Sequence, residues 1–379
     1  MIKSAFVFGA NGSGKSNFIS AIDFMKKIVL AELSLQSKMV SNIDNFAFSE
    51  TSSRTPSVFE VEFIADGMVF EYGFEILNSE VNREYLYRKT KRRTPVFIRT
   101  SPDFKDISLS KDMENVRVLT KNTRRDTLFL YWANGGNNDM AMTAYRWFES
   151  IQIFDASDSS QLSNKTIRYL EECKDNKNNV LGLLQRADVD ILDFDVDFLK
   201  KSMTTKHTVY NENWEEAGIV STPFSFESAG TRKLFEIAGP IIKALENGKV
   251  VFVDEIDSRL HPVIVRFVVS MFNSMSNNQN NAQLICNMHD VLLLDGDIRR
   301  DQVYFTEKDG YGVSKLYALT DFKGVRKESK LLKRYLLGAF GAAPKLKSFQ
   351  QQKQPSSCCE STARFQTKRL NMEKGQMLL

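Results

Sequence analysis

The stretch Gly9–Ser16, which reads GANGSGKS, decides the fold of this 379-residue chain. It matches the pattern G-x-x-x-x-G-K-[ST] in full. The segment 1–8 before it predicts a buried strand, and apolar residues at 4-3-4 spacing between 18 and 29 predict one face of a helix that runs to about residue 33. A complete pattern between a strand and a helix indicates a phosphate-binding loop; the alternative is a chance glycine-rich turn.

Such a loop binds phosphate because its glycines let the backbone N–H groups face inward, at the N-terminus of the following helix. Lys15 would reach the β- and γ-phosphates, and the Ser16 hydroxyl would ligate Mg²⁺. The residues predicted to bind nucleotide in this region are Gly9, Asn11, Gly12, Ser13, Gly14, Lys15, Ser16 and Asn17.

A second segment, Val250–Glu255, complements the loop. Its four apolar residues predict a strand buried on both faces, which ends in two carboxylates at the edge of a sheet. Asp254 can hold the metal through water, and Glu255 can accept a proton from the water that attacks the γ-phosphate. An apolar run before two acids is common by chance. The segment therefore indicates a metal and general-base role only in combination with the phosphate loop.

Two further pieces indicate which kind of P-loop protein this is. Ser228 and Gly230 lie in a Ser-x-Gly turn that begins a helix, 26 residues before Asp254, and can offer a hydroxyl and backbone N–H groups to a phosphate. The alternative for Ser228 is an ordinary helix cap. His289 follows another apolar strand, 35 residues past Asp254, which favours a γ-phosphate sensor over an isolated histidine.

Composition narrows the class of protein. Hydrophobic residues make up 42% of the chain, as in a folded globular protein, and no apolar run has the length of a membrane span. Four cysteines without metal-ligand spacing fit a reducing compartment, so we expect a soluble cytoplasmic protein. The segment 347–379 carries six Lys/Arg and two Glu, which accounts for the whole net charge of +4 and predicts a disordered basic tail.

The coarse organisation is α/β. Alternating residues over 56–90 predict an antiparallel hairpin with a third strand, 142–152 and 163–202 appear mainly helical, and 188–197 returns toward strand character. We expect an ATPase lobe at 1–150, a helical insertion at 151–215, a second ATPase lobe at 216–346 and the tail. Residues 163–205 are either a surface for a partner or substrate or a helical filler lobe.

In this order the four elements resemble the ATP-binding-cassette type of ATPase head found in RecF, SMC and OLD proteins. Lys15 and Ser16 match its Walker A pair, Asp254 and Glu255 its Walker B pair, and His289 its switch histidine. Ser228-Ala229-Gly230 is similar to its signature motif. Over residues 1–346 the motifs look like those of bacterial AAA-family ATPases of the ABC-like AAA-15 type, a group often found near mobile elements and antiphage systems.

The resemblance implies a P-loop NTPase of ABC-ATPase head type, with a mixed central sheet, an antiparallel β part and a helical insertion. It implies ATP and Mg²⁺ as cofactors and a homodimer in which each ATP lies between two protomers. Ser228 and Gly230 would then serve the partner's nucleotide, and Asp257 would lie at the junction of the two sites. It implies no membrane partner.

The sequence departs from this family at three places. Relatives carry β-strands before the phosphate loop, whereas the loop begins here at Gly9, which suggests an N-terminally shortened product with an exposed sheet edge. Glu227 and Ala229 stand in the signature where a hydrophobic residue and a second glycine are commoner, and the similarity ends after Leu346. No residue can be named for the Q-loop glutamine.

Three functions stay open. The first is an ATP-hydrolysing head in antiphage defence or mobile-element biology, which acts with a separate effector protein and senses nucleic acid or phage components. The second is a RecF- or SMC-like DNA-repair ATPase, against which stand the missing heptad arm and the absence of net charge in the body. The third is a shortened, non-hydrolysing nucleotide-binding fragment. A GTPase is disfavoured, because neither Asn-Lys pair continues into an N-K-x-D motif.

Overall fold

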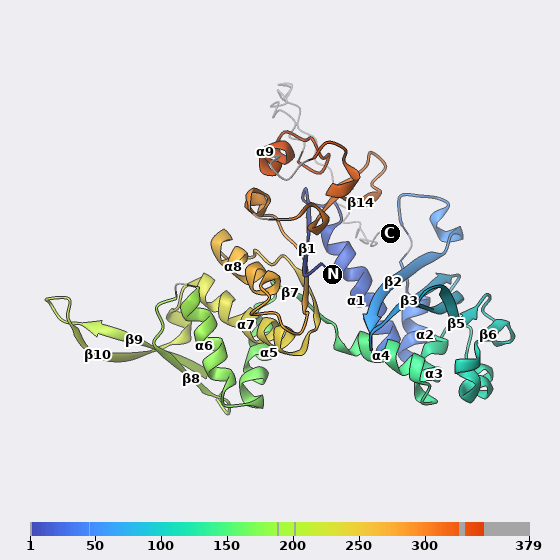
Figure 1. Cartoon of the computed structure of the whole chain (residues 1–379), viewed down its shortest axis with the longest axis horizontal. Coiled ribbons are helices and arrows are strands. Elements are labelled where there is room, and N and C mark those ends of the chain that lie inside the picture. Colours follow the sequence, from blue (N-terminus) through green and yellow to red (C-terminus); the bar gives the residue numbers. More distant parts are fainter. Residues whose placement is uncertain are drawn as a thin grey trace, which may run out of the picture.

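The protein is described by a computed structural model over residues 2–44, 46–187, 189–200, 202–296, 298–325 and 330–344. The predicted tail, 347–379, lies outside these residues. Three sheets organise the described part, and Figure 1 shows the phosphate-loop sheet near the middle of the molecule with the two antiparallel sheets toward its opposite ends. No helix of these described ranges has both the length and the apolarity needed to cross a membrane.

The central sheet carries the motifs. It has six strands, and every neighbouring pair is parallel except β13 with β14. Val251 and Val253 face one hydrophobic core and Phe252 faces the other, as expected for a parallel strand buried on both sides. In spatial order the strands are β14 (Ser314–Ala318), β13 (Val303–Lys308), β1 (Ser4–Gly9), β12 (Gln283–Asn287), β11 (Val250–Asp254) and β7 (Gln152–Asp155).

A five-stranded antiparallel sheet contains the predicted hairpin and its third strand, which the structure confirms. Its strands are β2 (Ser57–Ala65), β3 (Met68–Leu77), β4 (Glu80–Lys89), β5 (Arg93–Arg99) and β6 (Ile107–Leu109). Its apolar face packs with α1 (Lys15–Leu30), α2 (Leu33–Ser41), α3 (Phe129–Gly135) and α4 (Asp139–Ser150). The first helix ends at Leu30 rather than near residue 33, and a separate helix, α2, begins at Leu33.

The buried Glu84 carboxylate ties this sheet to the start of α3. The Glu84 carboxylate accepts hydrogen bonds from the backbone N–H groups of Phe129, at 2.6 Å, and Leu130, at 3.0 Å. Burial raises the pKa of Glu84, and Arg99 opposes that change. The Arg99 guanidinium is also fully buried and donates to backbone carbonyls, including that of Thr127 at 2.8 Å. A buried carboxylate is tolerated here because it faces the first N–H groups of a helix.

The segment 151–215, predicted as a helical insertion, contains strands as well as helices. Residues 151–215 contain α5 (Ser159–Glu172) and α6 (Asn176–Arg186), but also β7, β8 (Asp193–Asp197) and β9 (Ser202–Tyr210). The expected boundary at 215/216 falls in the turn between β9 and its antiparallel partner β10 (Glu216–Pro223). Threonine and valine are frequent in 203–209 and favour strand over helix. The division into lobes otherwise stays a prediction.

An ion-pair network fastens α6 to this third sheet, in which the strand order is β10-β9-β8. Lys177 and Lys206 both contact the carboxylates of Asp193 and Asp195. Burial alone would raise the pKa of Asp193, but hydrogen bonds from the two lysines outweigh it and lower the pKa to about 2. The carboxylate of Asp193 is therefore bound more strongly in its charged form.

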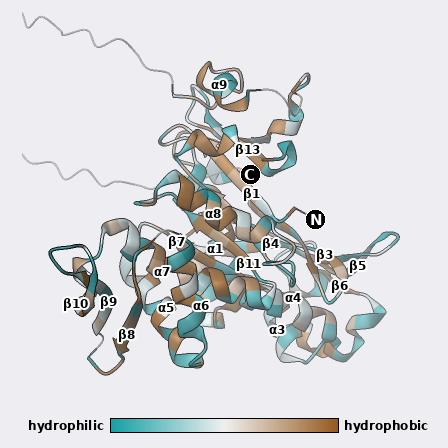
Figure 2. Cartoon of the chain, turned by 60° about the vertical axis from the view of Figure 1, so that its left-hand side comes forward, coloured by the Kyte–Doolittle hydropathy of each residue, from teal (hydrophilic) through white to brown (hydrophobic). Residues whose placement is uncertain are grey.

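The second α/β part completes the molecule with α7 (Ala229–Asn247), α8 (Pro262–Asn273) and α9 (Leu331–Leu336). Ser228 caps α7, and its other end has Gly248 in the left-handed conformation, with φ of 62°. Figure 2 shows hydrophobic residues concentrated along β1, β11 and α7. The observed class is the expected α/β P-loop architecture, with the carboxyl ends of β1, β11 and β12 at one edge of the sheet.

Candidate functional site

The loop after β1 has the backbone of a phosphate cradle. Gly12 and Gly14 adopt positive φ values of 70° and 106°, which place them in conformations that other residues avoid. A Cβ atom on Gly9 would lie 2.4 Å from the Thr306 hydroxyl and 2.6 Å from that of Ser13, so only glycine fits. These two hydroxyls are 2.7 Å apart and join the loop to β13. Sequence reasoning missed Thr306, because the pairing of β13 with β1 is long-range.

Lys15 lies inside the loop with only 6% of its surface exposed. Its ammonium group donates to the backbone carbonyls of Gly9, at 2.9 Å, and Ala10, at 3.3 Å. Burial lowers the pKa of Lys15, whereas the carboxylates of Asp257, Glu255 and Asp254 oppose that change. The charges of the predicted Walker B acids thus favour the protonated form of Lys15, the predicted Walker A lysine.

A direct hydrogen bond joins the two motifs. The Ser16 hydroxyl donates to the Asp254 carboxylate over 3.1 Å, although 238 residues separate them in sequence. Both side chains were predicted from sequence to be near the metal. Their contact follows from the topology, since β1 and β11 both flank β12 and all three point the same way.

Asn287, the last residue of β12, holds both Walker B residues and was not singled out by sequence reasoning. Its side chain is fully buried; its amide nitrogen donates to Asp254, and its amide oxygen accepts from the Glu255 backbone N–H at 2.7 Å. Glu255 has a φ of 52°, a conformation that costs free energy in a residue other than glycine. The hydrogen bond to Asn287 stabilises the backbone at that point.

His289, the predicted switch histidine, lies beside Glu255, the predicted general base. His289 Nε2 is 3.6 Å from Glu255 Oε1, and both side chains are partly exposed. The backbone N–H groups of His289 and Asp290 donate to the Asp257 carboxylate at 2.9 and 2.6 Å. The Asp257 side chain thus binds within its own protomer, whereas the resemblance placed this residue at a junction between protomers.

The donor set fits Mg²⁺ and a polyphosphate. The Asp254 carboxylate and the Ser16 hydroxyl lie together and are oxygen ligands of the kind that Mg²⁺ prefers, although the described residues contain no group of three or more His, Cys, Asp or Glu side chains that could hold a metal ion without a ligand. The loop N–H groups and the start of α1 are the complementary site for an anion.

Ser228 and Gly230 lie apart from this cluster. The Ser228 hydroxyl accepts from the backbone N–H of Thr231 at 3.0 Å, which is the ordinary helix-cap contact. Within the described residues, no hydrogen bond joins Ser228 or Gly230 to the loop. At the start of α7, Ser228 is exposed and Gly230 is partly exposed.

Two further predicted residues, Asn11 and Asn17, and one that was not predicted, Asp155, also lie near the site. Asn11 and Asn17 are exposed, so their side chains are available to a ligand. Asp155 ends β7 in register with Asp254, which adds an acid that sequence reasoning missed. Its signal was weak, since β7 has only four residues.

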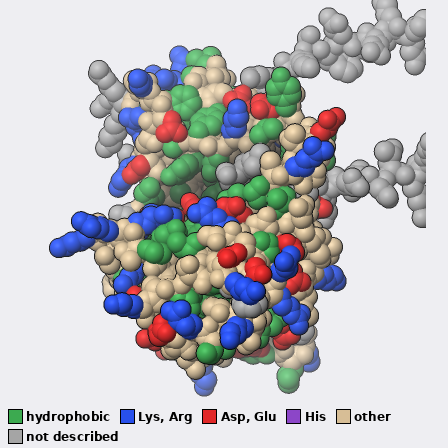
Figure 3. All heavy atoms as spheres, turned by 90° about the vertical axis from the view of Figure 1, so that its right-hand side faces the viewer, with side chains coloured by type: hydrophobic (Ala, Val, Ile, Leu, Met, Phe, Trp, Pro, Cys, Tyr) green, Lys and Arg blue, Asp and Glu red, His purple; other side chains and the backbone are tan. Residues whose placement is uncertain are grey.

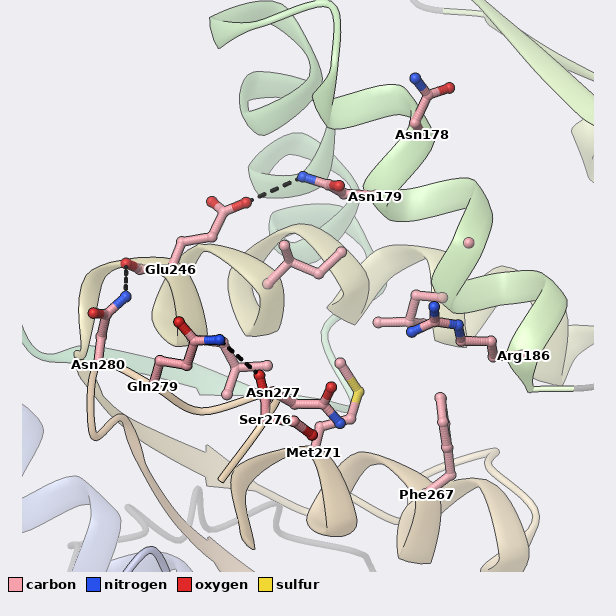
Figure 4. A pocket seen from close by; sticks show the side chains of 14 residues that line it. Asn178, Asn179, Arg186, Glu246, Phe267, Met271, Ser276, Asn277, Gln279 and Asn280 are labelled. Carbon is pink, nitrogen blue, oxygen red and sulfur yellow. Dashed lines mark hydrogen bonds between the residues drawn. The ribbon is translucent and has the colours of Figure 1, made fainter. Parts of the chain in front are cut away.

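Two cavities border on different parts of the molecule. One, of about 210 Å³, touches Asn11 and Gly12 of the loop and, across from them, Ala342. A larger one, of about 410 Å³, lies between α6, α7 and α8, away from the loop (Figure 4). Several of its amides bond to their own surroundings, as Asn179 does to Glu246. The larger of these two cavities is therefore not the one beside the predicted nucleotide-binding loop.

The fold and this cluster agree with a P-loop protein that contains an AAA domain. The chain belongs to the family described as "AAA domain, putative AbiEii toxin, Type IV TA system", whose model matches residues 4–295 and so includes all four motifs. Comparison with curated proteins gave no match.

Among solved structures, the chain is similar to cbiO1 from Clostridium perfringens, described as part of the ABC transporter complex cbiONQ. The identity is 15%, the match covers 52% of this chain and 67% of that chain, and the TM-score is 0.27. The family assignment rests on the sequence match alone.

Proposed function

We propose that this protein binds Mg²⁺-ATP at the loop Gly9–Ser16 and hydrolyses it. The observation that carries the proposal is the convergence of Lys15, Ser16, Asp254, Glu255 and His289, joined by the contacts described above. A phosphate cradle without acids would support binding alone. The acids beside it support hydrolysis.

Each side chain has a role that follows from its position. Lys15 exchanges its carbonyl partners for phosphate oxygens, and Ser16 and Asp254 hold the metal. Mg²⁺, when bound, offsets the negative charge that develops on the transferred phosphoryl group. Glu255 orients and deprotonates the attacking water, and His289 contacts the γ-phosphate from the side of Glu255.

We further propose that the active form is a head-to-tail homodimer. Ser228 is exposed, Gly230 is partly exposed, and the Ser228 hydroxyl bonds to its own helix rather than to the loop, which supports a role at the nucleotide of the partner. Bound ATP would then bridge the two protomers, and hydrolysis would loosen the contact.

The biological role we propose is antiphage defence or mobile-element biology, together with a separate effector protein. The family description, which refers to a putative toxin of a type IV toxin–antitoxin system, supports this direction, as does the resemblance of the motifs to those of the AAA-15 type. Figure 3 shows basic and acidic side chains interspersed on the face at the β5–β6 end, so that face gives no support to a nucleic-acid groove.

The proposal is tested with nucleotide affinity and a mixing experiment. Lys15→Ala should lose measurable ATP affinity by titration calorimetry, whereas Lys27→Ala, an exposed lysine of α1 that pairs with Asp23, should bind as the parent does. If the ATP affinity of Lys15→Ala were unchanged, the loop Gly9–Ser16 would not be the ATP-binding site. Mixing Lys15→Ala with Ser228→Ala should restore part of the hydrolysis, because one intact composite site forms; no recovery would indicate a site within one protomer.

A further inference from the structure

The hairpin formed by β9 and β10, residues 202–223, projects from the body at one end of the molecule (Figure 1), and we refer to it as the arm. β10 is an edge strand of its sheet, and most of its residues are exposed. Ile219 and Val220 leave 67% and 41% of their surfaces exposed. An isolated two-stranded hairpin is only marginally stable in water, so exposed apolar residues on a projecting one call for a partner.

The middle of the β10 edge lacks the usual protection. Natural edge strands carry charges, prolines or bulges that prevent pairing with another strand. The register shift of β10 lies at its start, between Glu216 and Gly218, and Pro223 ends the strand; between them, from Gly218 to Thr222, β10 has no charged residue and no proline. The segment is therefore competent to pair with another strand.

The other long free edge, β2, provides a contrast. It also has exposed apolar residues, but Glu60 and Glu62 alternate with them. Symmetric antiparallel pairing of two β2 strands about Val61 would set Glu60 opposite the partner's Glu62, and like charges in that position are destabilising. No such conflict arises for β10.

We propose that β10 pairs antiparallel with β10 of a second copy, which joins two three-stranded sheets into one of six. A twofold axis perpendicular to the sheet, centred on Ile219, sets this residue opposite the partner's Ile219. Val220 then lies opposite the partner's Gly218, and Glu216, the only charged residue of β10, lies opposite the partner's Thr222. The most exposed apolar side chain of the strand is buried at the centre of the contact.

A second copy fits the arm better than nucleic acid does. Residues 207–223 contain no lysine or arginine, and Glu212, Glu215 and Glu216 cluster at the turn. A phosphate backbone would be repelled there. Because the edge is self-complementary, one patch supplies both halves of the interface.

The arm contact is independent of nucleotide but lies next to the proposed signature. The Thr205 hydroxyl donates to Glu227 at 2.5 Å, and His207 Nε2 is 2.8 Å from the same carboxylate. Glu227 directly precedes Ser228. A dimer held by the arms would therefore keep the two signature segments near each other before ATP arrives.

The contact is small, since each copy offers about seven residues where stable interfaces use ~20–30 on each side. We expect a weak dimer whose population rises with concentration in sedimentation velocity without nucleotide. Ile219→Lys places two positive charges face to face across the twofold axis and should give monomers throughout the concentration series. Val58→Lys, which adds the same charge to an exposed position of β2, should sediment as the parent does.

Cross-linking keeps the test independent of folding effects. In a background with Cys173, Cys358 and Cys359 changed to serine, Ile219→Cys should form a disulfide dimer under mild oxidation, and Ser202→Cys, at the far end of the arm, should not. A parent that stays monomeric at all concentrations, or a dimer that survives Ile219→Lys, would overturn the arm contact. Both results leave the ATP proposal intact, because Lys15→Ala tests that separately.

Discussion

Replacing Asn287 by alanine should uncouple nucleotide binding from hydrolysis. The Asn287 side chain is fully buried. Its removal leaves the Glu255 backbone N–H without an acceptor and takes one hydrogen-bond donor from the Asp254 carboxylate. Leaving such a group unpaired costs about 1–3 kcal/mol, so the free energy of unfolding should fall by about 2–4 kcal/mol for the two together. Because Asp254 keeps its hydrogen bond from Ser16, we expect the total to stay below the sum of the two maxima.

The effect on turnover should exceed the effect on affinity. Lys15 and the loop N–H groups make no hydrogen bond to Asn287, so ATP affinity should fall less than about threefold. Without the amide, Glu255 no longer has its strained backbone fixed, and a displacement of about 1 Å can cost roughly 10²-fold in rate. We therefore expect kcat to fall by about 10- to 100-fold.

The assay compares kcat, ATP affinity and urea denaturation for the parent, Asn287→Ala and Asn287→Asp. The aspartate keeps the acceptor for Glu255 but replaces the donor that faces Asp254 with a carboxylate, so it separates the two contacts. We expect Asn287→Asp to lose Mg²⁺-dependent activity at least as strongly as the alanine variant. Asn287→Ala with the kcat of the parent would refute the positioning role of Asn287.

The remaining predictions concern fit, burial and pH. Gly9→Ala should lose ATP affinity and unfold at lower urea, because its Cβ would clash with β13, whereas Gly135→Ala, which meets no atom within 4 Å, should be neutral or stabilising by up to about 1 kcal/mol. Glu84→Ala should lower the free energy of unfolding by about 3–5 kcal/mol in urea titrations, since the backbone N–H groups of Phe129 and Leu130 and the Tyr72 hydroxyl lose their buried acceptor; an unchanged midpoint would contradict that. The lowered pKa of Asp193 adds stability above about pH 4 that is lost as the pH falls toward 2, and Asp193→Asn should flatten the acid limb of the stability curve over that range.

Much of the fold could be predicted because its signals are local. The loop Gly9–Ser16 has a fixed spacing, and β2 and β3 alternate apolar and polar residues around a two-residue turn. The four consecutive apolar residues of β11 indicate a buried strand by their composition alone. Such signals depend on neighbouring residues only, so they can be read from the chain.

What sequence reasoning missed depends on long-range pairing. β7 is too short to show a period, and its place beside β11 is fixed only by the assembled sheet. The arm lies in a polar stretch whose threonines favour strand but which has no clear alternation of apolar and polar residues, so the hairpin was not predicted. Asn287 and Thr306 gain their roles from strands that β1 joins across almost the whole chain. A search of strand ends at the carboxyl edge would have found Asn287.

The measurement that tests the central claim most directly is steady-state ATP hydrolysis by Glu255→Gln, alongside its ATP affinity. If the clustered residues act on one triphosphate, the variant binds ATP as the parent does and hydrolyses it about 10²–10⁴ times more slowly. A variant that turns over ATP at the parental rate would contradict the account, because the carboxylate beside His289 would then have no part in the chemistry.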